Sequence, residues 1–516
     1  MASIETYNTS RVAAELDFNE VLVLQLRRAP WFLLSVGAHA VLVLVFMLFA
    51  KPEEVTKSVQ APINASLPED KIIEEEIPPV PEETKEINPE EEVTEEPVVK
   101  DTEISDHNET DNNEEWQESK GDENQISDKP FDSTNSNDAI GFGGGAGGAF
   151  GGRRGGKRNL RAAGGGGRTQ SVVDAGLEWL KNHQSPEGVW DCDNFMANGD
   201  PKKGPLCDGR GQPQYDVGVS GLALLAFLGA GHTHRDGAYK ETVRKGFKWL
   251  AAQQDAEGCF GPRTFHYTYN HGIAALAMAE AWGMTQSGVW KTPAQKGIDF
   301  IIAAQNPYKA WRYDVKPGDN DVSVTGWMCM ALKSAKLGGG LVVPDEPLKN
   351  AHSFIKEMTE EESGRTGYTK KGERPVRPEG KETTFPAEES ESLTAVGMLV
   401  RVFGEENPKD SAMLKAGAEL LSKRLPIWEK STGKIDMYYW YYGTLAMFQM
   451  GGDAWNQWNT KMLDAIIKTQ RSDGNFKGSW DAEDAWGEDG GRVYSTAVMT
   501  MCLEVYYRYD RVFGTR

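Results

Sequence analysis

The sequence predicts an all-α protein whose folded part is an (α/α)6 toroid, a ring of six helical hairpins, preceded by a single transmembrane helix and a disordered linker. Three observations predict this arrangement. An apolar run stands near the N-terminus, an acidic tract rich in Pro and Glu follows it, and two kinds of helical segment then alternate from about residue 170 to residue 516.

Residues 31–50, WFLLSVGAHAVLVLVFMLFA, are long enough to cross a bilayer as one helix. Arg27 and Arg28 precede the run and an acidic tract follows Lys51, so the positive-inside rule places residues 1–30 in the cytoplasm and everything after residue 51 outside it. The alternative is a cleaved signal peptide. Its apolar core is usually shorter, and it needs a small-residue cleavage site that the following KPEEVTK does not offer. We expect an uncleaved membrane anchor.

One histidine lies inside this run. His39 in a transmembrane helix is costly unless it faces protein or water, and Ser35 lies one turn earlier on the same helix face. The S-V-G-A-H segment in an N-terminal anchor, followed by a Pro/Glu-rich spacer, resembles the TonB-type energy-transducing proteins. The resemblance implies that Ser35 and His39 contact a proton-driven motor complex in a bacterial inner membrane, with the toroid in the periplasm. The alternative is a histidine that neighbouring helices tolerate.

The acidity of the chain belongs to a linker. The whole chain has a net charge of -21, and residues 52–140 alone hold 28 acidic and six basic residues. With few large apolar side chains, residues 51–140 cannot bury enough surface to offset chain entropy, so we expect an extended, disordered spacer. The glycine-rich residues 141–168 are expected to form a flexible joint. No nucleic-acid partner is expected, because such binding relies on clustered Lys and Arg.

Helical segments of the first kind end in a glutamine, a glycine turn and an aromatic residue. The clear copies are GLEWLKNHQSPEGVW (176–190), GFKWLAAQQDAEGCF (246–260), GIDFIIAAQNPYKAW (297–311) and AIIKTQRSDGNF (465–476). Weaker copies fall at about 348–358 and 413–424. Their amphipathic pattern predicts helices that bury one face.

Segments of the second kind are small and apolar nearly all round, so they belong inside a larger assembly. They recur at a regular period when they are aligned at Gly221, Gly272, Gly326, Ala395, Gly443 and Thr496. Six hairpins follow, with the apolar helices as an inner ring and the amphipathic helices as an outer ring. Closure of this ring over residues 169–516 removes the exposed apolar ends that an open solenoid must cap.

The Q-x-x-x-G-x-(W/F) signature resembles the QW repeat of squalene-hopene cyclases, in the terpenoid cyclase/prenyltransferase family of toroids. The pairs that carry it are Gln184/Trp190, Gln254/Phe260 and Gln470/Phe476. The resemblance implies that these residues are structural. Each Gln amide is expected to bond the backbone of an adjacent helix end while the aromatic ring packs over it.

The same resemblance identifies candidate catalytic acids. A protonating cyclase needs an acid in a dry, aromatic cavity, and the family supplies it with a D-x-D-D segment before an inner helix. The nearest counterpart here is Asp319-Asn320-Asp321-Val322, with Asp321 in the place of the proton donor and Asp319 as the first acid. Val322 replaces the last acid, which indicates a degenerate motif and argues against hopene-type cyclisation.

Polar and aromatic residues stand just before the inner helices, whose N-termini should converge on one mouth where helix dipoles favour anionic groups. These residues are Asp216, Tyr267, Asp321, Glu391 and Tyr438. Asp216 is a third candidate acid, although Asp and Glu are also ordinary N-caps. Trp327 and the run YYWYYG, which includes Trp440 and Tyr441, are candidates to line a cavity, with core packing as the alternative.

No cofactor or metal is expected. Protein prenyltransferases share the toroid and hold a catalytic zinc, but the residues of ligand type here lack a recognisable spacing. These residues are Asp191, Cys192, Asp193, Cys207, Asp208 and His271. An oxidising compartment would favour a disulfide between Cys192 and Cys207. The acidic loop 481–489 is a candidate for Ca²⁺, with a solvated loop as the alternative.

Three functions fit these features. The leading prediction is a membrane-anchored, extracytoplasmic toroid that binds an isoprenoid, a lipid, a glycan or a protein partner in the cell envelope. One alternative is an active, divergent terpene cyclase of the squalene type. The other is a toroidal polysaccharide lyase or hydrolase, which requires paired carboxylates across a cleft.

Overall fold

The computed structural model describes residues 166–508, without the side chains of residues 507 and 508. The predicted cytoplasmic segment, anchor and spacer lie outside this range, and so does nearly all of the glycine-rich joint. Within residues 166–508 no helix is both long enough and apolar enough to cross a bilayer. The predicted membrane anchor at residues 31–50 is not among them.

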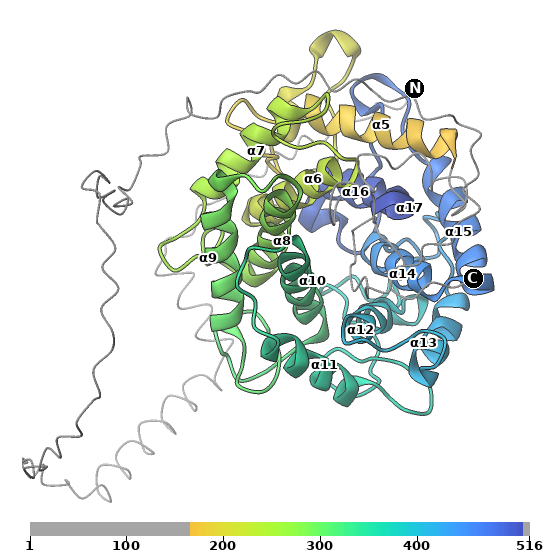
Figure 1. The fold of residues 1–516 in the computed structure, drawn as a ribbon. Coiled ribbons are helices and arrows are strands. Elements are labelled where there is room, and N and C mark those ends of the chain that lie inside the picture. The colour runs from red at the N-terminus through yellow and green to blue at the C-terminus, as the bar shows by residue number, and fades with distance from the viewer. Residues whose placement is uncertain (1–165, 509–516) are drawn as a thin grey trace, which may run out of the picture. The chain divides into compact units, whose positions relative to one another are not determined.

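Twelve helices of the described chain alternate between an outer and an inner position (Figure 1). The outer helices are α5 (Gly167–Asn182), α7 (Lys240–Ala252), α9 (Gly288–Ala304), α11 (Glu346–Met358), α13 (Ala412–Ser422) and α15 (Gly452–Ile467). The inner helices are α6 (Asp216–Gly229), α8 (Tyr267–Thr285), α10 (Val322–Gly338), α12 (Ser392–Phe403), α14 (Met437–Met450) and α16 (Gly487–Leu503). Short elements connect or follow them: η1 (Phe195–Asn198), η2 (Pro201–Lys203), η3 (Pro213–Tyr215), η4 (Ala387–Glu389), η5 (Gly474–Phe476) and α17 (Val505–Arg508).

The sequence patterns explain which helix lies where. In α6 every residue after Asp216 is buried, because helices pack on all sides of it. In α7 only one stripe is buried, including Val243, Phe247 and Leu250 at helical spacing. The prediction of apolar inner helices and amphipathic outer helices is confirmed.

The ring is closed. Each inner helix packs against the next, and α16 packs against α6 (Figure 1). The first helix, α5, packs on α16, so the two ends of the described chain together complete the circle. Gly221 of α6 lies against Ala274 of α8, and Gly272 of α8 lies against Trp327 of α10, so equivalent positions of neighbouring inner helices are side by side. The inner helices therefore run parallel, and their N-termini share one mouth.

The repeat glutamines link four of the six outer helices to the next outer helix around the ring. Gln184 Nε2 donates to the carbonyl oxygen of Gly188 in its own turn at 2.9 Å and to that of Thr242 in α7 at 3.0 Å. The other copies do the same: Gln254 bonds Gly258 and Pro293, Gln305 bonds Lys309 and Pro347, and Gln470 bonds Gly478 and Val172. The predicted structural role of these amides is confirmed. The last copy returns to α5, so the same bond closes the ring.

The turn glycine of the repeat is required by space and by backbone conformation. Gly188 has a φ of 104°, and a Cβ there would lie 2.4 Å from the carbonyl oxygen of Lys245. Gly478 has a φ of 97°, and its Cβ would lie 2.1 Å from the carbonyl oxygen of Ala175. Only glycine combines a left-handed backbone with this close approach at low cost.

The aromatic partner in the last repeat was predicted wrongly. Trp190 and Trp311 donate from Nε1 to the carbonyl oxygens of Leu180 and Ile301, each four residues before the repeat glutamine. Trp480, not Phe476, makes this bond in the last copy, to Ile466 at 2.8 Å. The turn after Gln470 is four residues longer than in the other copies, which moves the aromatic position along the chain. The sequence spacing could not reveal this insertion, because Phe476 matches the shorter spacing by chance.

Substituting Gln470 with Ala should loosen the closure of the ring. The change leaves the carbonyls of Val172 and Gly478 without their donor, at a cost of about 1–3 kcal/mol of unfolding free energy. Hydrogen exchange should become faster in α5. The matched control is Gln305→Ala, which removes the same bonds inside the ring and should speed exchange around Pro347 instead. Unchanged protection of α5 in the Gln470 variant would contradict the closure role.

Candidate functional site

Asp321 is the predicted site residue with the most unusual environment. It is the N-cap of α10, where Oδ1 accepts the backbone N–H of Val324 at 2.7 Å, and it is completely buried. Its Oδ2 has no hydrogen-bond partner, and the nearest cationic atom is Arg312 Nε at 3.8 Å. Burial raises the pKa of this carboxyl to about 7, against the opposing effects of the Val324 amide and the Arg312 charge. Near neutral pH a large fraction of Asp321 therefore carries a proton.

Tyrosines from four different segments surround this acid. The charge of Asp321 contributes to raising the pKa of Tyr269, Tyr313, Tyr368 and Tyr438, with burial as the larger cause in each. The hydroxyls of Tyr313 and Tyr368 bond each other, and the Arg312 guanidinium lies 5.2 Å from the ring centre of Tyr313 and 5.8 Å from that of Tyr368. Aromatic faces therefore surround one acid and one cation.

The predicted mouth residue Tyr438 is part of this group. Its hydroxyl bonds Ser323 Oγ, two residues after Asp321, at 2.6 Å. Burial raises the pKa of Tyr438 and of Tyr269, yet both side chains keep partial solvent exposure. Tyr269 and Tyr438 therefore lie among protein groups near the starts of α8 and α14 and remain partly reachable by solvent.

The predicted acids Glu391 and Asp319 form ion pairs with arginines. Glu391 is buried and paired with Arg365 and Arg374, and it also accepts a bond from Thr394. Asp319 is largely exposed and pairs with Arg312. The predicted mouth residue Tyr267 donates its hydroxyl to Asp314 Oδ1 at 2.7 Å. Of the predicted acids at α10 and α12, only Asp321 is both buried and left with an oxygen that makes no hydrogen bond.

The predicted cavity-lining aromatics are core residues. Trp327 stacks on Tyr441 with ring centres 5.7 Å apart, and each is at most 4% exposed. These rings join α10 to α14. Trp440 packs instead against Trp428, in the loop between α13 and α14. Core packing, the alternative given above, describes all three.

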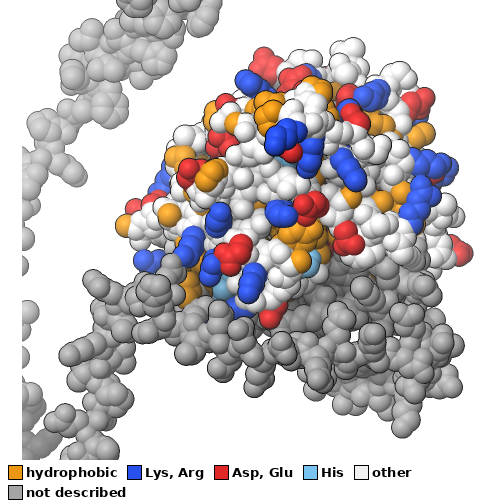
Figure 2. Space-filling model, turned by 90° about the horizontal axis from the view of Figure 1, so that it is seen from above, with side chains coloured by type: hydrophobic (Ala, Val, Ile, Leu, Met, Phe, Trp, Pro, Cys, Tyr) orange, Lys and Arg blue, Asp and Glu red, His pale blue; other side chains and the backbone are white. Residues whose placement is uncertain are grey.

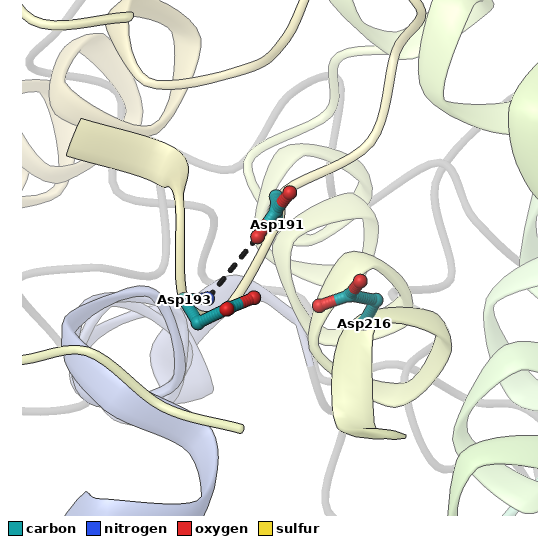
Figure 3. A group of neighbouring side chains, drawn as sticks. All are labelled: Asp191, Asp193 and Asp216. Atoms are coloured by element: carbon teal, nitrogen blue, oxygen red, sulfur yellow. Dashed lines mark hydrogen bonds between the residues drawn. The ribbon is translucent and has the colours of Figure 1, made fainter. Parts of the chain in front are cut away.

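Asp216, the third predicted acid, belongs to a separate cluster with Asp191 and Asp193 (Figure 3). Their oxygens lie within 4.8 Å of one another, and this is the one group in residues 166–508 that could hold a metal ion. Such an all-oxygen set suits Ca²⁺ or Mg²⁺ better than zinc. Each of two carboxylates already binds the backbone, since Asp191 accepts from Asp193 and Asn194, and Asp216 accepts from Cys192. These bonds account for the cluster as the support of a turn.

The remaining residues of zinc-ligand type are structural and lie apart. His271 accepts the backbone N–H of Phe260 at Nδ1, and its Nε2 lies 3.1 Å from the carbonyl oxygen of Gly297. Burial lowers its pKa to about 3. In other repeats, the backbone N–H of the repeat aromatic donates to a hydroxyl at the equivalent position of the inner helix. These hydroxyls belong to Ser220, Thr325 and Thr496. His271 is the equivalent residue of the second repeat. This places Thr496 in register with Ser220 rather than with Gly221.

The predicted disulfide between Cys192 and Cys207 is wrong, because both cysteines are free and buried. The Cys207 thiol donates to the carbonyl oxygen of Asn475 at 3.2 Å and lies 3.6 Å from His183 Nε2. Cys192 is fully buried beside Asp216, which accepts its backbone N–H. Cys207 therefore fastens its loop to the last repeat, a segment about 270 residues away, rather than to Cys192.

The acidic loop 481–489 does not gather its carboxylates for Ca²⁺. Asp481 pairs with Arg471 and Arg492. Asp484 is instead buried beneath the first turn of α14, where its Oδ2 accepts the Met437 amide at 2.9 Å and the Tyr494 hydroxyl at 3.1 Å. Burial, followed by the charge of Asp436, raises the pKa of Asp484 to about 7.

Several site residues escaped the sequence analysis. Arg312 and Tyr313 follow the repeat tryptophan in the third copy, and an arginine directly after a buried aromatic was an available signal. Tyr368 lies in the long loop between α11 and α12, and no periodicity connects it with Asp321. The sequence therefore identified the acid and missed most of its surroundings.

On the face shown in Figure 2, basic and acidic side chains are intermixed over the described residues, and apolar side chains form small groups. This agrees with the confinement of the net charge of -21 to the residues before 141.

Among known proteins, only solved structures are similar to this chain. No family model matches the sequence, and no curated protein matches it. Among solved structures, a variant of the type II terpene cyclase MstE from Scytonema in complex with merosterolic acid A has 14% identity and a TM-score of 0.41, covering 66% of this chain and 97% of that one. An inactive variant of the α-1,6-mannanase GH76A of Salegentibacter sp. HEL1_6 with α-1,6-mannotetrose has 12% identity and a TM-score of 0.45, covering 66% and 99%. An α-amylase from Clostridium perfringens has 12% identity and a TM-score of 0.42, covering 66% and 98%.

At these identities and TM-scores the likenesses carry no argument about chemistry, and the squalene-hopene cyclase-like family remains a proposal. What residues 166–508 themselves establish is a closed, all-helical toroid of six hairpins in which the buried acid Asp321, at the mouth of the inner ring, keeps one oxygen without a hydrogen bond.

Proposed function

We propose that this chain is a membrane-anchored toroid that binds an isoprenoid or a comparable lipid at the mouth of the inner ring, with Asp321 as the acid that contacts the ligand. The observation that carries the proposal is the buried, partly protonated Asp321 carboxyl, whose Oδ2 makes no hydrogen bond of ordinary length.

This arrangement supports acid catalysis on an alkene. Proton transfer from Asp321 Oδ2 would form a C–H bond with the π electrons of the ligand and leave a carbocation. The rings of Tyr269, Tyr313, Tyr368 and Tyr438 would face that positive charge. The carboxylate left behind would be stabilised by Arg312, 3.8 Å away, and would regain a proton when the product loses one. Since Val322 stands in the place of the last motif acid, burial takes over the task of raising the pKa.

The test uses the full chain in phospholipid nanodiscs with squalene or prenyl diphosphates, followed by mass spectrometry. We expect a retained isoprenoid and a cyclised product that falls by at least about 100-fold in Asp321→Asn, the usual range for loss of a general acid. The matched control is Asp319→Asn, two residues earlier and exposed, which should keep the product. Failure of the wild-type chain to retain any isoprenoid would remove the proposal.

Residues 31–50 are proposed to hold the toroid in the bacterial inner membrane, with residues 51–140 as the periplasmic spacer. His39 is the proposed contact to a proton-driven motor complex, together with Ser35. We expect His39→Ala to abolish co-purification with motor subunits, whereas Ala38→Leu, a neighbouring apolar change, should preserve it. Equal co-purification of the His39 variant and the wild type would remove the motor contact and leave the anchor in place.

A further inference from the structure

The first turn of α14 carries a second group of unsatisfied polar atoms. Buried polar side-chain atoms rarely lack a hydrogen-bond partner, because leaving one unpaired destabilises the fold. Asp484 Oδ1, Trp486 Nε1 and Arg377 Nη2 are three such atoms. Together with Asp321 Oδ2 and Arg312 Nε, they place five unsatisfied atoms around the same mouth.

Direct contacts connect these three residues to the N-terminal end of α14. Asp484 Oδ2 accepts the Met437 amide at 2.9 Å, and Arg377 Nη1 binds Asp436 Oδ2 at 2.7 Å. Asp436 is itself the N-cap of α14, accepting the Tyr439 amide at 2.9 Å. The indole of Trp486 lies edge-on to the ring of Tyr438, with centres 6.2 Å apart. Tyr438 reaches Ser323 beside Asp321, so it separates the two acids of the mouth.

The hydrogen-bonding character of this group selects a ligand chemistry. Trp486 Nε1 and Arg377 Nη2 can only donate, and the protonated form of Asp484 also donates. A hydrocarbon would leave all three unsatisfied. An anion is disfavoured as well, because Asp436 already neutralises Arg377 and Asp484 adds negative charge when it ionises. An uncharged oxygen, such as a hydroxyl, carbonyl or ether, satisfies these donors.

We infer that the ligand carries an uncharged, oxygen-bearing end that binds at the first turn of α14, with Asp484, Trp486 and Arg377 as its hydrogen-bonding groups. The inference rests on the proposed function and names the ligand more closely: the apolar body lies among the tyrosines at Asp321, and the oxygen lies on the far side of Tyr438. Asp484 is then a second ligand-contacting acid of the toroid.

The test compares two probes that differ in a single oxygen. The full chain in nanodiscs is titrated with geranylgeraniol and with its deoxy hydrocarbon, and retention is followed by native mass spectrometry. We expect the wild type to prefer the alcohol by about tenfold, the value of one well-placed hydrogen bond. Asp484→Leu should remove most of this preference without weakening the hydrocarbon. Asp484→Asn should keep most of it, since an amide still donates.

A second variant covers the case in which Asp484→Leu fails to fold. Trp486→Phe keeps the ring and removes only the Nε1 donor, and it should lower the preference for the alcohol about threefold. Equal retention of the two probes by the wild type would overturn the inference and leave the proposed function standing. An alcohol preference that survives both Asp484→Leu and Trp486→Phe would overturn it as well. Retention of neither probe would overturn the proposed function and the inference together.

Discussion

Asp321→Asn should become steadily more stable relative to the wild type as the pH rises from about 4 to about 7. The folded-state pKa of Asp321 is raised to about 7 from an ordinary value of 3.8. Below pH 4 the carboxyl is protonated in both the folded and the unfolded chain, so it does not lower the free energy of unfolding. Between the two values the unfolded chain releases the proton and the folded chain keeps it, so wild-type stability falls with rising pH. Above pH 7 the loss is complete and amounts to as much as about 4 kcal/mol.

Asparagine cannot ionise but caps a helix as well as aspartate does, so the variant removes the part of the pH dependence that Asp321 causes and keeps the bond to Val324. The measurement is denaturant unfolding at pH 4, 5, 6, 7 and 8. Asp319→Asn, an exposed neighbour, should run parallel to the wild type. Asp484 has a similar raised pKa, so a slope should persist in Asp321→Asn and become much shallower in the Asp321→Asn/Asp484→Asn double variant, where Asp216, whose pKa burial raises to about 6, still contributes. Parallel curves for Asp321→Asn and the wild type would show that the carboxyl is not buried as described.

Arg377→Met should destabilise the fold by about 3–5 kcal/mol, the cost of leaving one charge of a buried ion pair without its partner. Both side chains of the Arg377–Asp436 pair are 2% exposed, and their nitrogen and oxygen lie 2.7 Å apart. Without the guanidinium, the Asp436 carboxylate at the start of α14 would have no compensating cation. The measurement is the free energy of unfolding in denaturant at neutral pH.

A second substitution identifies the cause. Arg377→Met/Asp436→Asn keeps the cap on Tyr439 and removes the buried charge, so it should recover most of the lost stability. The matched control is Arg424→Met, which removes an arginine from a partly exposed pair with Glu389 and should cost about 1 kcal/mol or less. A loss below about 1 kcal/mol in Arg377→Met would show that the pair does not hold the first turn of α14.

The two variants report on the two sides of one site. Asp321 and Asp436 are both N-caps of inner helices; Asp321 was among the residues predicted at the mouth, whereas Asp436 was not. Their chemistry differs because their neighbours differ: Asp436 has a buried arginine within hydrogen-bond distance, while Asp321 has Arg312 only at 3.8 Å. The N-cap of α14, Asp436, therefore forms a buried ion pair, whereas the N-cap of α10, Asp321, is a partly protonated acid.

Local patterns predicted the fold well. The glutamine, glycine and aromatic spacing predicted the outer helices, and the apolar segments predicted the inner ring, because helical periodicity and turn chemistry act over a few residues. The same reasoning failed at Phe476, where four extra residues in one turn moved the aromatic position to Trp480. It also failed at Cys207, whose partner Asn475 is distant in sequence.

The sequence by itself determined the ring of six hairpins and the convergence of Asp216, Tyr267, Asp321, Glu391 and Tyr438 on the starts of inner helices. Only the tertiary structure decided which of these groups is free to act. Glu391 is held by two arginines from the preceding loop, whereas Asp321 keeps one oxygen without a partner. The physical reason is that the protonation and hydrogen bonding of a buried carboxyl depend on neighbours and desolvation, which closure of the ring imposes from segments far apart in the chain.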